Sequence, residues 1–522
     1  MNIEPEALNS KINRLSDHVD LGDLRRDKLF IRVVRQSIGA QSCSLRQMTH
    51  TKADYKALRR LLNNDKLSIE VMRQILYNLT SSQLEPYRNT EQYLVAAFDA
   101  SYLNYGSHSS KPRKSSFNDK KSEGYLLLSN TVFELRRGNL VGFAGQCLVN
   151  SQGPDDLEHL ELEPALRKEY RTNERVWHQQ QTLRAFERFE SGLRVLHAGD
   201  AQYDDVCTWR TLTKSLPQGH HFIINGVLDR VISVRRQQLS YIETHEVERA
   251  HRTDDFDDTS FREVHLERLA KGLKLKPYKT IWVDPRGRIA SKQSKKSKKV
   301  RLGIGGVSVW LHRKSERGSR LKQVEKGLKL TAVVVRDRDD VDGLCWVLWT
   351  TLQPEQAQLA AEGYLCRWRI EEWHRTLKQT LKLKESRLQT PEALAKLLVL
   401  LSVKTMLIEE CRSDTGIKSG QKLSKSQRKK LISSGQKAQR LEEARWKRGK
   451  KPGKYEQNER AWMLLGLMAV KGRWHINNNL SLGNTLLQEG LDYIMNEARM
   501  GHWLWLLNPS ESSEPPEQNV GY

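Results

Sequence analysis

The stretch 364-YLCRWRIEEWHRTLK-378 places two adjacent glutamates among arginines and a lysine. Because no Pro or Gly interrupts it, and because Ile370 and Leu377 are spaced for one helix face, a single helix is predicted. At about 100° per residue, four polar side chains then fall within an arc of roughly 60°: Tyr364, Arg367, Glu371 and Lys378. This stripe predicts that Glu371, and not its neighbour Glu372, shares a face with a phenol and two cations.

The stripe has two physical interpretations. A carboxylate beside Arg and Lys on an exposed helix face can form an ordinary ion pair, worth only about 0.3–0.5 kcal/mol. Alternatively, Glu371 is placed there because it takes part in chemistry. The helix alone leaves both interpretations open.

The composition indicates a polyanionic partner. The 522 residues include 87 Lys and Arg against 63 Asp and Glu, which gives a net charge of +24. A positive excess of this size favours nucleic acid. The hydrophobic content of 38% fits a folded globular chain, and its length allows roughly two to four domains.

Two protein classes are not indicated. No segment approaches the roughly 18 uninterrupted apolar residues of a membrane span, and the N-terminal residues lack the apolar core of a signal peptide. We therefore expect a cytoplasmic protein without a membrane partner. The six cysteines are scattered without a CxxC pair, which disfavours a disulfide framework and a structural zinc site.

Changes in sequence pattern divide the chain. Apolar and basic residues alternate at helical spacing near the N-terminus, strand-like apolar runs follow, and short β-rich runs come next. Three strands, a helix around 173–190 and a fourth strand give the opening order of an RNase H-like α/β fold. The predicted parts are a basic helical domain (1–85), the core (86–217 and 353–390), an all-β insertion (218–352), a helical C-terminal region (391–508) with a basic arm (420–454), and a disordered tail (509–522).

Two further acids stand where a strand gives way to a loop. Asp99 ends the apolar run LVAAF, and Asp200 ends RVLHAG. Each alone is most simply a turn or cap residue. In an RNase H-like sheet, however, the first and fourth strands lie side by side, and a later helix can bring a third acid to the same edge. Asp99, Asp200 and Glu371 together predict a site for two Mg²⁺ ions about 3.5–4 Å apart, as used in phosphoryl transfer.

The spacing Y-x2-R-x3-E-x6-K from Tyr364 to Lys378 resembles the YREK signature of bacterial cut-and-paste DDE transposases of the insertion sequence 4 family. The residues RWRIEEWH around the glutamate are similar to the family's, and the order Asp, Asp, Glu is kept. Asp200 opens DAQYD, which is similar to the family's D-x-x-x-D element, with Asp204 as its second acid. The resemblance covers nearly the whole chain, although only these motifs are specific.

The resemblance implies a catalytic cycle on DNA. Asp99, Asp200 and Glu371 would bind Mg²⁺ or Mn²⁺ and serve every step: a nick that frees the 3′-OH of the transposon end, formation and opening of a hairpin, and strand transfer into target DNA. Three residues of the signature would contact backbone phosphate near the cleaved bond: Tyr364, Arg367 and Lys378.

The family eases hairpin formation by flipping a base onto a tryptophan in the β insertion. Trp346, in CWVLWTT, corresponds to that position, because W-x-x-x-T recurs at a similar distance before the tyrosine. Trp349 is an alternative three residues on, and a strand tryptophan is more often a core residue. His374 lies near the predicted catalytic face, where it relays protons, touches phosphate or simply packs.

The resemblance also implies partners. We expect double-stranded DNA, both as transposon terminal inverted repeats and as target, and a homodimer in the synaptic complex of a cytoplasmic, nucleoid-associated bacterial protein. Residues 1–85 would bind the transposon end, and 391–508 would dimerise. Two other classes remain: an RNase H-like nuclease or resolvase that cuts without joining, and a non-catalytic transposase-derived DNA-binding protein, which the intact Asp, Asp, Glu set disfavours.

Overall fold

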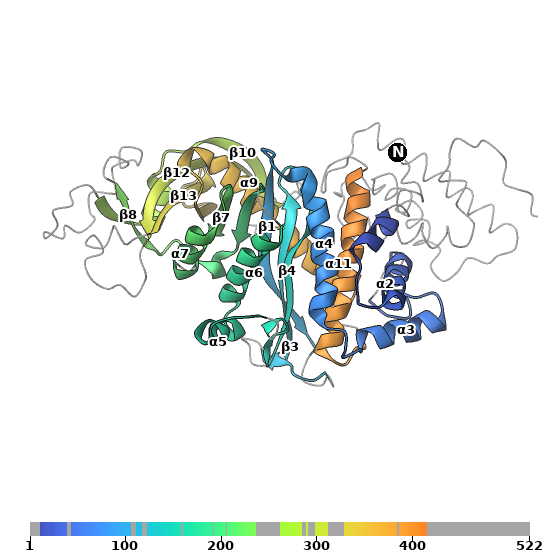
Figure 1. Cartoon of the computed structure of the whole chain (residues 1–522). Coiled ribbons are helices and arrows are strands. Elements are labelled where there is room, and N and C mark those ends of the chain that lie inside the picture. The colour runs from blue at the N-terminus through green and yellow to red at the C-terminus, as the bar shows by residue number, and fades with distance from the viewer. Residues whose placement is uncertain are drawn as a thin grey trace, which may run out of the picture.

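A computed structural model gives the architecture of the chain (Figure 1). Most of the predicted C-terminal region 391–508, including the basic arm 420–454, and all of the tail 509–522 lie outside the described residues. The described residues are 11–38, 43–105, 111–116, 123–157, 160–189, 192–204, 206–235, 261–283, 289–290, 298–311, 328–383 and 386–414.

The N-terminal residues form helices, as their spacing predicts. Side-chain oxygens of Asp23, Thr51 and Ser68 accept backbone N–H groups at the helix starts, which satisfies donors that the first turn leaves unpaired. A short 3-10 turn, η1 (Ser16–His18), precedes them, and another, η2 (Glu85–Tyr87), follows. The helices are α2 (Leu24–Ser37), α3 (Lys52–Leu62) and α4 (Ile69–Leu84).

A mixed sheet forms the centre of the molecule, which confirms the expected α/β class in its coarse form. Five strands lie in the order β4-β3-β1-β6-β7, with β1, β3 and β4 antiparallel and β6 and β7 parallel to β1. The strands are β1 (Tyr93–Asn104), β3 (Glu123–Glu134), β4 (Leu140–Asn150), β6 (Arg194–Gly199) and β7 (His220–Asn225).

The predicted insertion 218–352 departs from expectation in two ways. Its first strand, β7, pairs in parallel with β6, so it continues the central sheet. The insertion is also not entirely β, because Leu266–Gly272 forms helix α8 with Leu266, Leu269 and Ala270 buried. Apolar residues at i, i+3 and i+4 suit a short amphipathic helix, a signal that the surrounding strand-like runs obscured.

Most of the remaining strands extend the same sheet beyond β7, whereas β5 pairs with β4 and β2 pairs with β3 on the other side. β14 pairs with β7, β13 with β14, β12 with β13, and β10 with β12, so the described strands make one 14-stranded sheet. They are β2 (Ser115–Ser116), β5 (Gly153–Pro154), β8 (Val231–Arg235), β9 (Phe261–His265), β10 (Lys276–Val283), β11 (Ile289–Ala290), β12 (Lys298–Leu311), β13 (Leu328–Asp337) and β14 (Cys345–Thr350).

Helices cover both faces of the central strands (Figure 1). Alternate residues of β1 belong to different clusters: Val95 and Ala97 share a core with the N-terminal helices and α11, while Leu94 and Ala96 belong to a separate cluster. This alternation follows from the two-residue period of a strand. Further helices are α5 (Pro164–Thr172), α6 (Glu174–Phe189), α7 (Val206–Ser215), α9 (Ala357–Arg367), α10 (Arg369–Arg375) and α11 (Pro391–Asp414); short 3-10 turns are η4 (Ala201–Tyr203) and η8 (Pro354–Gln356).

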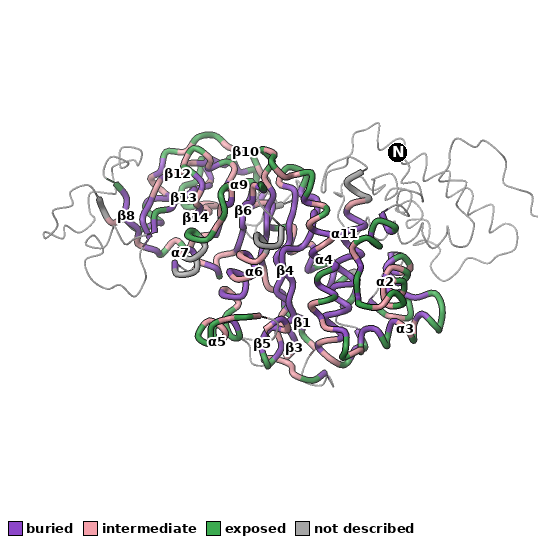
Figure 2. Tube along the Cα trace, viewed as in Figure 1, coloured by how far each residue is buried: buried purple, intermediate pink, exposed green. Residues whose placement is uncertain are grey.

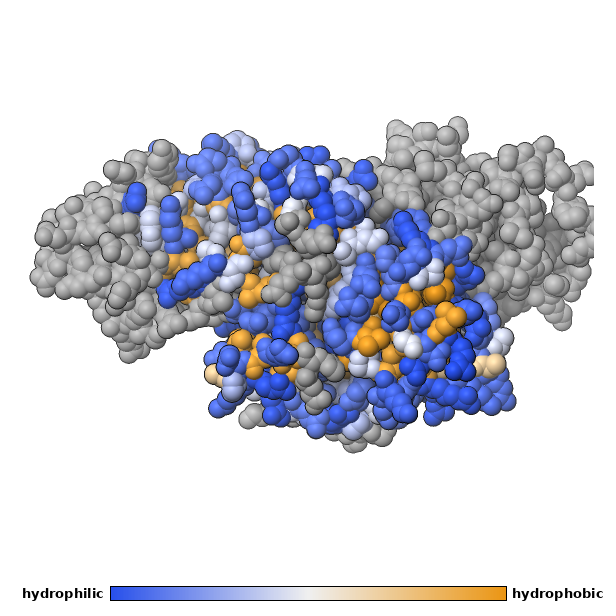
Figure 3. All heavy atoms as spheres, in the orientation of Figure 1, coloured by the Kyte–Doolittle hydropathy of each residue, from blue (hydrophilic) through white to orange (hydrophobic). Residues whose placement is uncertain are grey.

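The N-terminal helices and α11 share one hydrophobic core with the sheet, which extends from Ile12 to Ile408. Figure 2 shows this as buried chain along β1, β4, α4 and α11. On the face in Figure 3, hydrophilic residues cover most of the described surface, and hydrophobic ones gather where α2, α4 and α11 lie together. Within the described ranges, no helix has the length and apolar character to cross a membrane.

Candidate active site

The predicted helix 364–378 is helical throughout but is not one continuous α-helix. α9 ends at Arg367, and after a turn at Trp368 α10 begins. The N–H of Glu371 donates to the carbonyl of Trp368 at 3.2 Å, a bond that tightens this turn. After α10, the chain forms a π-helical turn, η9 (Thr376–Thr380), which carries Lys378. The expectation of a single regular helix is therefore wrong, because side-chain spacing does not report these backbone changes.

Asp99 and Asp200 lie level with each other on neighbouring strands. In the parallel pair β1 and β6, Ala97 is opposite Ala198, so two residues further along Asp99 comes beside Asp200. Asp200 directly follows Gly199, the last residue of β6. Its carboxylate accepts the N–H of Ala201 at 2.6 Å. Asp200 therefore stands at the carboxyl end of β6. Asp99 lies within β1, which continues to Asn104 in its pairing with β3, so the expectation that Asp99 ends a strand is wrong.

The two acids also share one face of the central sheet. Gly199 faces Phe98, because a Cβ at residue 199 would lie 2.2 Å from Cε2 of that ring. Side chains alternate along a strand, so Asp99 and Asp200 point to the opposite face. On that face lies α9, whose Gly363 approaches Leu196 of β6. Glu371, the expected third acid, lies on the next helix, α10.

Arg367 connects the acids at the centre of the site. Its Nη2 donates to Oε1 of Glu371 at 3.2 Å, and its guanidinium lies 5.4 Å from the centre of the Tyr364 ring. The side chain of Arg367 is only 3% exposed, against 38% for Glu371. The arginine is thus buried, while Glu371 faces solvent in part. The expected contact of Arg367 with DNA phosphate stays a prediction.

Arg367, Glu371 and Asp200 all act electrostatically on Asp99. Burial raises the pKa of Asp99 to about 6; Arg367 opposes the rise, and Glu371 and Asp200 add to it. Tyr364, Asp200, Asp99 and Glu371 in turn keep the pKa of the Arg367 guanidinium raised, against the effect of burial. The sequence-predicted residues are therefore close enough to interact electrostatically.

Tyr364 is buried beside the same cluster. Burial raises its pKa to about 12, although Arg367 lowers it, so the phenol keeps its proton at neutral pH. Glu372, by contrast, belongs to a different pair: Nη1 of Arg369 donates to its Oε2 at 2.7 Å. The two neighbouring glutamates consequently face different partners, as the helical arc predicts.

His374 packs against Asp99, a position that the sequence suggested only loosely. Its Nδ1 lies 3.8 Å from Oδ2 of Asp99, and its Nε2 lies 3.3 Å from Oγ of Ser129. Burial, with a smaller contribution from Lys378, lowers the pKa of His374 to about 3, so the ring is neutral at neutral pH. Its contact with Asp99 is therefore not an ion pair. Nothing in the sequence marked Ser129, which is opposite Asp99 on β3.

Asp204, the second acid of DAQYD, has a different role. Its carboxylate pairs with the guanidinium of Arg230, and it accepts the N–H of Val227 at 2.9 Å. Both partners of the ion pair are almost fully buried. This acid therefore ties the loop after β6 to the segment after β7 and is positioned for structure rather than chemistry.

The two tryptophans of β14 differ in burial. Trp349 is fully buried, with its ring 6.2 Å from that of Trp209, whereas Trp346 is partly exposed. The residue paired with Ile224 of β7 is Trp349, and Ile224 is in turn opposite Gly199 of β6. Trp346, three residues earlier, therefore lies beyond the carboxyl edge of β7, on the side where Asp200 is found.

A second acidic cluster lies on β4 and the segment after it, two strands from Asp99: Cys147 is opposite Leu128 of β3, which is opposite Ala100 of β1. Among the described residues, Cys147, Asp155 and Asp156 form the one group of three whose ligand atoms all lie within 4.8 Å of each other. Asp155 is paired with the buried guanidinium of Arg73, and Asp156 accepts from Tyr170 at 2.8 Å. Burial also raises the pKa of the Cys147 thiol. The cluster is thus already neutralised and hydrogen-bonded as part of the core.

The site near Asp99 is defined by these observations and not by any recognised relative. Comparison with family models and with curated proteins finds no match to this chain. What the geometry defines is a class of site: carboxylates at the edge of a mixed sheet, gathered around a buried arginine.

Proposed function

We propose that the chain is a metal-dependent DNA transposase of the DDE class, similar to those of the insertion sequence 4 family. The observation that carries the proposal is the gathering of Asp99, Asp200 and Glu371 around Arg367. A surface ion pair needs one acid, not three from distant parts of the sequence. The simpler interpretation of Glu371 as an exposed helix partner is therefore disfavoured.

The donor set fits a hard divalent cation. Three carboxylates against one guanidinium leave two negative charges in excess when all are ionised, and oxygen ligands are what Mg²⁺ and Mn²⁺ prefer. Asp99, Asp200 and Glu371 would hold the ions. When bound, such ions polarise the phosphate and favour deprotonation of an attacking water or hydroxyl.

The remaining side chains have defined roles in this proposal. Arg367 holds Glu371 in position, and His374, neutral and packed against Asp99, limits the rotation of that carboxylate. Tyr364 and Lys378 flank the site, where a phenol and an ammonium can contact phosphate oxygens. Trp346, partly exposed beyond the same edge, is the candidate surface for a flipped base.

The strand order supports the finer fold assignment. Three antiparallel strands followed by two strands parallel to the first, in the order β4-β3-β1-β6-β7, are what an RNase H-like core requires. In this proposal β7 belongs to the core, and the insertion begins after Asn225. The net charge of +24 fits the double-stranded DNA partners of such an enzyme. The proposal includes a synaptic homodimer.

The decisive assay uses a labelled duplex that carries the terminal sequence of the element encoding the chain, with a supercoiled plasmid as target and Mg²⁺ or Mn²⁺. We expect a nick at the element end, a hairpin, and joined product, all abolished by EDTA. Cut ends that never join would instead indicate a nuclease. Binding without any cutting would contradict an enzymatic role.

Gly199→Ala tests the approach of β6 to β1 just before Asp200. A Cβ there meets the Phe98 ring, so the strand or the ring must shift. We expect a loss of about 1–3 kcal/mol in the free energy of unfolding, together with at least a roughly tenfold slower cutting step, since small displacements of catalytic groups slow chemistry steeply. Denaturant unfolding and single-turnover cutting measure the two effects. Ala198, which is also buried on β6, provides the matched control as Ala198→Gly, which should lower stability without clashing with Phe98.

A further inference from the structure

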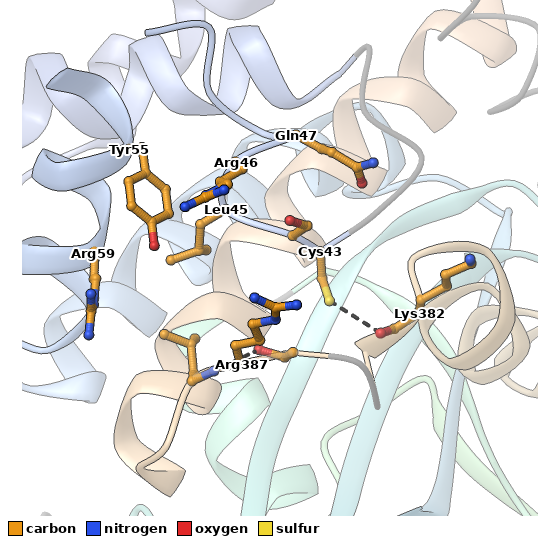
Figure 4. Close-up of a pocket in the computed structure, with 11 residues that line it drawn as sticks. Cys43, Leu45, Arg46, Gln47, Tyr55, Arg59, Lys382 and Arg387 are labelled. Carbon is orange, nitrogen blue, oxygen red and sulfur yellow. Dashed lines mark hydrogen bonds between the residues drawn. The ribbon is translucent and has the colours of Figure 1, made fainter. Parts of the chain in front are cut away.

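A basic cavity lies between the N-terminal helices and the segment that follows the π-helical turn (Figure 4). Its volume is about 810 Å³. Three arginines line it: Arg46 and Arg59 from the N-terminal region, and Arg387 from a distant part of the sequence. Lys382 contributes to the floor, with its side chain directed away from the arginines in Figure 4. No carboxylate is among the described residues that line the cavity.

The arginines are available for a ligand. In the described part of the chain, no ion pair joins Arg46, Arg59 or Arg387 to an acid. All three are exposed, and the guanidinium of Arg46 lies 5.6 Å from the centre of the Tyr55 ring, which steadies it. Arginines held apart around an open cavity, without acids, suit several phosphate oxygens rather than one internal partner.

The cavity wall is fixed to the catalytic helix. The N–H of Cys43 donates to the carbonyl of Leu381 at 2.7 Å, and its thiol lies 3.3 Å from the carbonyl of Lys382. On the other side, the ammonium of Lys111 donates to the carbonyl of Ser386 at 3.1 Å. The loop that carries Arg387 is therefore held from two directions.

The spacing matches DNA bound at the acids. Lys382 follows Glu371 by 11 residues, which spans at most about 16 Å at 1.5 Å per residue. Along duplex DNA, at about 3.4 Å per base pair, this is at most roughly five base pairs. One duplex can therefore reach both the carboxylates and the cavity.

We propose that this cavity binds the phosphodiester backbone of the DNA duplex cut at Asp99, Asp200 and Glu371, within about five base pairs of the cleaved bond. The proposal rests on the proposed function for its DNA partner. The cavity then positions the duplex, because phosphate held by Arg46, Arg59 and Arg387 sets where the DNA crosses the carboxylates. Since the contacts are to backbone, they carry no sequence preference.

The test compares Arg46→Ala/Arg387→Ala with a matched control, Lys168→Ala/Lys214→Ala, which removes two exposed charges from α5 and α7. Binding of the labelled terminal duplex and of a random-sequence duplex is measured by fluorescence anisotropy from low to high salt. We expect the cavity pair to weaken both duplexes about tenfold or more and to lower the salt slope by about 2. The control pair should change the slope little. Thermal unfolding checks that both pairs fold.

Location is tested with single neutral methylphosphonates placed along the terminal duplex. The wild type should bind more weakly when a methylphosphonate replaces a phosphate near the predicted position. The Arg46→Ala/Arg387→Ala variant already lacks that contact, so the same replacement should not weaken its binding further. An equal further loss in the cavity pair would overturn the proposal, as would equal salt slopes for cavity and control pairs. A third result would also overturn the proposal: potassium phosphate alone stabilises the wild type but not the Arg46→Ala/Arg387→Ala variant, while the two bind DNA equally well. That result would assign the cavity to free anions.

The failures are distinguishable. If wild type cuts and joins DNA but the cavity pair binds as the control pair does, the cavity proposal fails and the transposase proposal stands. If the wild type never cuts DNA, yet the cavity pair still weakens binding with the lower salt slope, the transposase proposal fails and the phosphate site stands.

Discussion

Glu371→Gln is expected to abolish Mg²⁺-dependent cutting and joining, with a loss of about 10³-fold or more, while DNA binding survives. Glutamine keeps the shape of the side chain and its contact with Arg367 but removes the charge that a divalent cation requires. The reason is the position of Glu371 in the cluster that also holds Asp99 and Asp200. Single-turnover assays on the terminal duplex measure the loss.

Glu372→Gln is the matched control. This acid pairs with Arg369 at 2.7 Å on a partly exposed surface, an interaction worth at most about 1 kcal/mol. We expect near-normal cutting from this variant. If Glu372 proved essential and Glu371 dispensable, the assignment of Glu371 to the catalytic face of α10 would be wrong. Glu372 would then have to replace it in the proposed site.

Asp99→Asn is expected to stabilise the metal-free protein at pH 7.5 while abolishing cutting. The buried carboxyl has a pKa of about 6 in the folded chain, against about 3.9 when unfolded. Between these values the folded state binds more protons, so stability falls as pH rises from about 4 through about 6, and the loss is nearly complete by about pH 7. Asparagine removes this cost, which is roughly 1–3 kcal/mol.

Thermal unfolding across pH checks the sign. The advantage of Asp99→Asn should vanish near pH 4, and excess Mg²⁺ should stabilise the wild type but not the variant, since a ligand stabilises the state that binds it. Wild-type cutting should also decline as pH falls below about 6, because a protonated carboxyl does not bind metal. A variant less stable than wild type at pH 7.5 without metal would contradict this account.

The sequence predicted the members of the site better than their environment. Asp200 could be found because it follows the apolar run that forms β6. The expectation that Asp99 also ends a strand was wrong, because β1 continues past it to Asn104 in its pairing with β3; only its place after an apolar run singled it out. Helical spacing separated Glu371 from Glu372. Spacing could not show that Arg367 is buried, since burial depends on how α9 packs against the sheet.

The fold was predictable where apolar patterns are long. The helices before residue 85 and the first strands of the sheet follow directly from periodicity. Pairing across the chain does not: β7 joins the central sheet because it lies parallel to β6, a contact that local pattern cannot reveal. The break at Trp368 and the π-helical turn after α10 likewise depend on backbone packing. Helix α8 was missed because only seven residues form it.

The central claim is that Asp99, Asp200 and Glu371 hold the divalent cation, and iron-directed cleavage of the protein backbone tests it most directly. Fe²⁺ with ascorbate and peroxide generates hydroxyl radicals at the metal, which cut the nearby chain. The account predicts cuts near residues 99, 200 and 371, suppressed by excess Mg²⁺ and absent in Asp99→Asn. Cuts near residues 147 and 155–156 instead would place the metal in the Cys147 cluster and contradict it.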